Sequence, residues 1–120
     1  MEITTRDDKH CTIVEIGGQL DRTTAPQVEA RLQGLIDSSE TSRIVLDLSG
    51  VPEMSSAGLR VIISAVKRLR SSRSGGDLRL AAPGKRVASV LELAGLLPVM
   101  QVYDTVEEAV ESFQTWGKPR

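Results

Sequence analysis

Apolar residues along this chain alternate between the spacing of buried strands and the spacing of amphipathic helices. The clearest strand is residues 43–50, where Ile44, Val45, Leu46 and Leu48 form a nearly unbroken β-favouring run. Such a run is typical of a strand covered on both faces in a parallel sheet. From residue 59 to residue 70 apolar positions recur every three or four residues, which predicts a helix. Its apolar stripe consists of Leu59, Ile62, Ile63, Val66 and Leu69.

The flanking sequence predicts further strands and helices by the same criteria. β-branched residues on either side of the polar stretch 7–10 predict an opening hairpin. Later apolar runs alternate between strand and helix spacing. The strands are expected at residues 2–6, 11–16, 77–82 and 99–103, and the helices after Thr24, over 87–94 and after Thr105.

Residues with capping chemistry mark the ends of the expected helices. Thr24 with Gln27, and Thr105 with Glu108, have the spacing of a capping box, in which the threonine hydroxyl accepts a first-turn amide. Gly95 stands where a glycine commonly ends a helix. Ser55 or Ser56 is expected at the N-cap of the helix that runs to residue 70, with its hydroxyl accepting a hydrogen bond from a first-turn amide.

The resulting order, ββαβαβαβα, predicts an α/β fold. Strands that alternate with helices form a largely parallel central sheet through right-handed crossovers, here preceded by the N-terminal hairpin. The 120 residues suit one domain able to bury roughly two thirds of its unfolded surface. We expect a single domain over residues 1–116 and a polar tail over 117–120.

Composition narrows the possible partners and the compartment. Fifteen basic and sixteen acidic residues give a formal net charge of −1, so no global field favours direct binding to nucleic acid or an anionic membrane. Cys11 is the only cysteine, which excludes an internal disulfide, and we expect it to be a small strand residue. No apolar run approaches the roughly 20 residues that span a bilayer, so no membrane insertion and a cytoplasmic location are expected.

The residues needed for catalysis or cofactor binding are not grouped in the sequence. The only histidine, His10, falls in the expected hairpin turn, and the serine pair lacks the G-x-S-x-G context of a hydrolase nucleophile. One histidine and one cysteine do not make a metal site, and no glycine-rich loop has the phosphate-binding P-loop pattern. We therefore expect no enzyme activity, no metal and no cofactor.

Ser56 has two interpretations from its chemistry. The first is structural, because serine is common at the start of a helix. The second is modification, because the free amides and positive dipole end of a helix N-terminus tolerate an anion such as phosphate. The small residues Ala57 and Gly58 would leave the first turn uncrowded for another protein's active site.

Residues 54–62, MSSAGLRVI, resemble the signature of the STAS domain of bacterial anti-sigma factor antagonists. Residues 17–32, 79–96 and 102–110 resemble other helix regions of that family. The resemblance implies the STAS fold, with Ser56 as the phosphorylated residue, three positions before Leu59. It also implies that Asp21 lies beside this serine and supports contact with a kinase, although Asp21 is equally suited to an Asx turn before its helix.

The expected site lies where two parallel strands end. The loops after the strands near Gly17 and Ser49 should leave the same edge of the sheet, where open α/β sheets place ligands. We expect both loops to face one partner around Ser56. The expected partner-binding residues are Asp21, Thr23, Thr24, Met54, Ser55, Ala57, Gly58 and Arg60.

The resemblance implies a partner-switching regulator. In that mechanism the unphosphorylated protein binds an anti-sigma factor serine kinase with a histidine-kinase-like ATPase fold and so frees a sigma factor. Phosphorylation of Ser56 ends binding, and a PPM-type serine phosphatase restores it. The alternative is a constitutive STAS interaction subunit of a transport or signalling assembly. Glu53 and Ser55 depart from the usual family residues, an aromatic or apolar residue and Asp, which leaves partner choice open.

Overall fold

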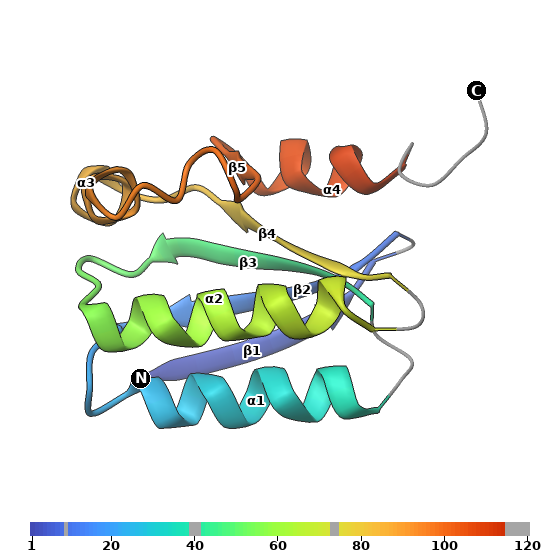
Figure 1. The fold of residues 1–120 in the computed structure, drawn as a ribbon, viewed down its shortest axis with the longest axis horizontal. Helices are drawn as coiled ribbons and strands as arrows, with labels where there is room; N and C mark the ends of the chain where they lie inside the picture. Colours follow the sequence, from blue (N-terminus) through green and yellow to red (C-terminus); the bar gives the residue numbers. More distant parts are fainter. Residues whose placement is uncertain (9, 39–41, 73–74, 115–120) are drawn as a thin grey trace.

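The computed structural model describes residues 1–8, 10–38, 42–72 and 75–114. Over these residues the chain forms five strands and four helices in the predicted order (Figure 1). The strands are β1 (Glu2–Asp7), β2 (Thr12–Gly17), β3 (Arg43–Gly50), β4 (Asp77–Ala81) and β5 (Val102–Tyr103). The helices are α1 (Ala25–Asp37), α2 (Ser56–Arg70), α3 (Lys85–Leu93) and α4 (Val106–Gln114).

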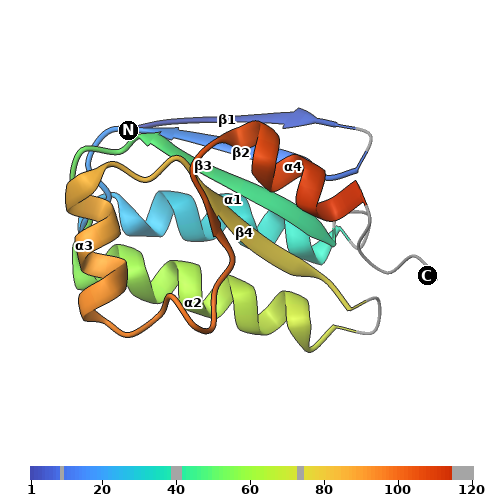
Figure 2. The same cartoon turned by 90° about the horizontal axis from the view of Figure 1, so that it is seen from above.

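The sheet runs in the order β1-β2-β3-β4-β5. β1 pairs with β2 in the predicted antiparallel hairpin, and each later neighbour pairs in parallel. Helices α1 and α2 cover one face, α4 lies on the other, and α3 lies at the end of the sheet where α2 begins (Figures 1 and 2). The α/β class and the largely parallel sheet predicted from the sequence are confirmed.

β3 is buried on both sides, as its apolar run predicts. Ile44, Leu46 and Leu48 point into the larger hydrophobic cluster beneath α1 and α2, whereas Val45 belongs to the smaller cluster beneath α4. All four are fully buried. The buried members of the larger cluster are aliphatic, and the aromatic ring of Phe113 belongs to the smaller one.

Three helix and strand details differ from the prediction. The buried face of α2 includes Val61 and Ala65, while Leu59 and Ile63 are only partly buried, so its core-facing stripe is rotated from the predicted one. β5 begins at Val102 instead of residue 99, because the amides of Val99 and Met100 both donate to Leu96 O in a turn. Cys11 is buried but precedes β2 instead of lying within it.

Two predicted helix ends are confirmed. Gly95 has φ +72°, its amide donates to Glu92 O, and the amide of Leu96 donates to Leu91 O, which is the Schellman pattern. At the start of α4 the amide of Glu108 donates to Thr105 Oγ1 over 3.1 Å, so Thr105 caps that helix.

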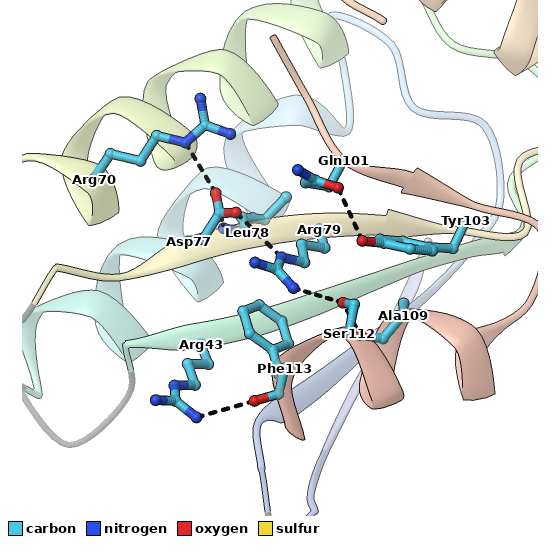
Figure 3. A network of polar contacts seen from close by, with 10 residues as sticks. All are labelled: Arg43, Arg70, Asp77, Leu78, Arg79, Gln101, Tyr103, Ala109, Ser112 and Phe113. Atoms are coloured by element: carbon cyan, nitrogen blue, oxygen red, sulfur yellow. Dashed lines mark hydrogen bonds and ion pairs between the residues drawn. The ribbon is translucent and has the colours of Figure 1, made fainter. Parts of the chain in front are cut away.

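A buried polar network fastens α4 to the sheet (Figure 3). Arg79 and Asp77, both 6% exposed, form an ion pair of 3.2 Å between Nε and Oδ2, and Arg70 donates to the other Asp77 oxygen over 3.0 Å. Arg79 also donates to Ser112 Oγ over 2.6 Å. Its guanidinium carbon lies 4.1 Å from the centre of the Phe113 ring, a cation–π contact.

A second arginine holds the end of the same helix. Arg43 Nη1 donates to Phe113 O over 3.3 Å, so a cation lies at the carbonyl end of α4, where the helix dipole favours it. Arg43 and Arg79 come from neighbouring strands and approach Phe113 from its backbone and its ring (Figure 3). α4 is therefore anchored at Phe113 by packing and by charge together.

Removing the Phe113 ring should therefore destabilise the whole domain. We expect Phe113→Ala to lower the free energy of unfolding by about 3–5 kcal/mol, because a fully buried ring and its contact with Arg79 are lost. Gln114→Ala, at the exposed neighbouring position, should change it by less than about 0.5 kcal/mol. Urea unfolding followed by circular dichroism measures both. Equal effects of the two substitutions would contradict the anchoring role of Phe113.

Candidate partner-binding site around Ser56

Two loops meet at the carboxyl ends of β2 and β3, as predicted. The amide of Gly18 donates to Gly50 O over 2.9 Å, and the amide of Leu20 donates to Glu53 O over 3.1 Å. Leu20 O in turn accepts the amide of Ser55 over 2.9 Å, and Leu20 and Met54 form a parallel bridge. The parallel pairing of β2 with β3 thus continues past the strands up to the first residue before α2.

Gly58 is needed because Leu20 packs against the first turn of α2. A Cβ placed on Gly58 would lie 2.5 Å from Leu20 Cγ and 2.9 Å from Leu20 O. Leu20 itself is fully buried. The sequence-based reason for Gly58, open space for an approaching protein, is therefore wrong, since the chain's own Leu20 fills that space.

Asp21 organises the loop before α1 through an Asx turn. Its Oδ1 accepts the amides of Thr23 over 2.9 Å and Thr24 over 3.1 Å. The structural interpretation of Asp21 is therefore confirmed. The same contacts hold its carboxylate at a fixed place in the loop that pairs with Glu53 and Ser55, so a role at the site is compatible with them.

The capping box predicted for Thr24 is wrong. Thr24 is the N-cap residue of α1, but its hydroxyl makes no capping hydrogen bond. It donates instead to Gln19 O over 2.7 Å and accepts the amide of Asp21 over 3.0 Å. The hydroxyl is therefore oriented by the loop and not by the amides of the first helical turn.

The two serines at the start of α2 have different environments. Ser55 is the N-cap residue, in extended conformation with φ −95° and ψ 176°, but its hydroxyl makes no capping hydrogen bond. Its oxygen is buried and has no hydrogen-bond partner within the described part of the chain. Ser56 is the first residue of the helix and is exposed. The predicted hydroxyl cap is therefore absent at Ser55, whose hydroxyl oxygen is buried, whereas Ser56 is an exposed residue.

The predicted partner-binding residues divide by exposure. Thr23 and Arg60 are exposed like Ser56, and Asp21, Thr24, Ser55 and Ala57 are partly buried. Met54 and Gly58 are buried, so they can shape this surface but do not offer side-chain contacts to a partner. The structure brings the two loops together, with the buried residues beneath and Ser56 at the surface.

Sequence reasoning missed the contact between this loop and α3. Arg86 Nη1 donates to Glu53 Oε1 in an ion pair between side chains that are 76% and 49% exposed. The two residues are 33 positions apart and both exposed, so no periodicity relates them. From the sequence, Glu53 differs from the usual family residue, but nothing in the pattern pairs it with Arg86.

Other chemistry is sparse in the part of the chain that the structure describes. Within it no group of three or more His, Cys, Asp or Glu side chains is placed to hold a metal ion. Burial, with a smaller effect of the Asp8 carboxylate, raises the pKa of the Cys11 thiol to about 11, so the thiol stays protonated near neutral pH. None of the described helices has the length and apolar character to cross a membrane.

Comparison with known proteins places the chain in a family. Residues 2–109 match the STAS domain, and the chain belongs to that family. BtrV of Bordetella bronchiseptica, provisionally named an anti-sigma factor antagonist, is 37% identical over 98 residues, which are 82% of each chain. The anti-sigma-B factor antagonist of Listeria monocytogenes is 32% identical over 102 residues, covering 85% of this chain and 86% of that one.

A solved structure has the same fold. The crystal structure of a Thermotoga maritima protein, also provisionally named an anti-sigma factor antagonist, superposes with a TM-score of 0.86 and 27% identity. The match covers 93% of this chain and 94% of that chain. The resemblance stated from residues 54–62 is thus confirmed at the level of family and fold.

Filling the space at Gly58 should disturb the loop pairing. We expect Gly58→Ala to lower the free energy of unfolding by about 1–3 kcal/mol, because the new methyl meets Leu20 side chain and backbone. Gly34→Ala is the matched control, since that glycine also lies inside a helix and a Cβ there meets nothing within 4 Å. The control should be stabilising by about 0.5–1 kcal/mol. Thermal unfolding of both variants measures these changes. A change in stability of the same sign in both variants would contradict the close contact between Gly58 and Leu20.

Ser55→Ala should not behave like the loss of a helix cap. Removing a capping hydroxyl typically costs about 1 kcal/mol. The Ser55 hydroxyl instead is buried without a partner, so its removal should leave stability unchanged or slightly raised. Urea unfolding of the variant and the wild type measures this. A loss of about 1 kcal/mol or more would show that the hydroxyl is bonded in solution.

Proposed function

We propose that this protein is an anti-sigma factor antagonist that works by partner switching at Ser56. In its unphosphorylated form it binds an anti-sigma factor serine kinase with a histidine-kinase-like ATPase fold, and the sigma factor held by that kinase is released. The kinase uses ATP to phosphorylate Ser56, which ends binding. A PPM-type serine phosphatase returns the protein to its binding form. The names of the family relatives support the general role.

The observation that carries this proposal is the contrast between the two neighbouring serines. The Ser55 oxygen is buried, so a kinase could reach it only after the loop had opened. Ser56 is exposed as the first residue of α2, directly after the loop whose Ser55 amide donates to Leu20 O. Of the two serines, a kinase would thus meet only Ser56 at an accessible and fixed position.

The surroundings of Ser56 favour a switch that leaves the fold intact. Phosphorylation adds about −1.5 to −2 charges and three acceptor oxygens. The first turn of α2 contains no acidic residue, so the positive end of the helix dipole can offset part of this charge. The Asp21 carboxylate, fixed by two amides on the adjoining loop, would stand on the same partner-facing surface. Repulsion from Asp21 and a clash with the partner are two ways in which the phosphate would end binding.

The decisive experiment is phosphorylation of the purified protein. We expect that ATP and the histidine-kinase-like serine kinase encoded in the same genome place one phosphate on Ser56, located by mass spectrometry. Ser56→Ala should accept no phosphate yet keep binding to the kinase, and Ser56→Asp should bind more weakly because of its charge. Ser55→Ala is the matched control and should be phosphorylated like the wild type.

Three outcomes would count against the proposal. Phosphate on Ser55 would overturn the assignment drawn from the buried hydroxyl. A stable complex in which no residue becomes phosphorylated would favour the alternative, a constitutive STAS interaction subunit. Tight binding of Ser56→Asp, equal to that of the wild type, would contradict the charge-based switch.

A further inference from the structure

The ion pair between Glu53 and Arg86 joins the loop of Ser56 to the start of α3. Glu53 lies three residues before Ser56, and Arg86 is the second residue of α3. α3 lies at the end of the molecule where α2 begins (Figure 1). The pair therefore spans two separate elements beside the proposed phosphorylation site.

The backbone fixes Glu53 relative to Ser56. Glu53 O accepts the amide of Leu20, and the next residue, Met54, is buried in the bridge to Leu20. Of the residues between Glu53 and Ser56, Met54 is buried and Ser55 is partly buried, whereas Glu53 and Ser56 are exposed. A partner that approaches the Ser56 hydroxyl would meet the Glu53 carboxylate and its arginine at a defined place.

The pair contributes little to the stability of the fold. Exposed ion pairs typically contribute about 0–1 kcal/mol, and the Arg86 side chain is 76% exposed. Lys85 and Arg86 also place two cations in the first turn of α3, which has no acidic residue, where the helix dipole disfavours positive charge. Glu53 supplies a compensating negative charge from outside the helix. Glu53 and Arg86 can therefore exchange their mutual ion pair for ion pairs with a partner protein without unfolding the domain.

We propose that the Glu53–Arg86 pair determines which kinase binds at Ser56. The selected kinase presents a cation to Glu53 and an anion to Arg86, and kinases with other charges at these places are rejected. Charges at the rim of an interface act mainly on association rate and on the choice of partner. This inference rests on the proposed function, and it gives a physical role to Glu53, one of the two residues that depart from the usual family residues.

Exchange of the two charges tests the proposal. The double variant E53R/R86E keeps an ion pair but reverses its direction. It should unfold at a temperature equal to or slightly above that of the wild type, because a glutamate in the first turn of α3 also suits the helix dipole. We expect its binding to the kinase that phosphorylates the wild type to weaken about tenfold or more, because both rim contacts become repulsive. The matched control is R6E/E15R, which reverses an exposed ion pair between β1 and β2, and it should bind like the wild type.

A neutral variant keeps the test decisive if the exchange disturbs folding. E53Q/R86Q removes both charges; Glu53→Gln keeps the side-chain shape, and Arg86→Gln shortens an exposed side chain. The variant should bind more weakly than the wild type, with an association rate that depends less on salt. Binding of both variants within twofold of the wild type, or an equal loss in R6E/E15R, would overturn the inference. Failure of the wild type itself to bind or to be phosphorylated would instead defeat the proposed function.

Discussion

The contact between Leu20 and Gly58 fixes the position of the candidate site around Ser56. Leu20 bridges to Met54, binds the amide of Ser55 through its carbonyl and fills the space beside the first turn of α2. A larger residue at position 58 would separate the helix from the loop. The position of Ser56 at the surface, and that of Asp21 on the adjoining loop, both follow from this one close approach.

Patterns with a short range predicted most of the fold. The apolar run of β3, the helical spacing of α2 and the glycine at position 95 each depend on neighbours in the chain, and each was confirmed. In the first turn of α2, Gly58 is the residue that packs against Leu20, whereas Leu59 is only partly buried. Helical spacing alone could not distinguish Leu59 from Val61 as the deeper residue.

Polar contacts between residues far apart in the chain could not be predicted from the sequence. Asp77 and Arg79 are two residues apart in β4 and so lie on one face, but their burial depends on α4, which returns to cover them. Glu53 and Arg86 meet only because α3 is placed beside the start of α2. Thr24 had the right residue type for a cap, yet the loop around Asp21 competes for its hydroxyl. In each case the side chain's hydrogen-bond or ion-pair partner either lies far away in the sequence or is one of several nearby groups that could serve.

The anchor of α4 at Phe113 lies at the opposite end of β3 from Ser56. Phe113 O accepts a hydrogen bond from Arg43, the first residue of β3, whereas Ser56 comes after the strand has ended at Gly50. Eight residues of extended chain measure about 26 Å, which is the scale of the separation. A surface tether or fluorescent label attached at the exposed Gln114 would thus leave the Ser56 face turned toward solution, an advantage for attaching this protein to a sensor surface.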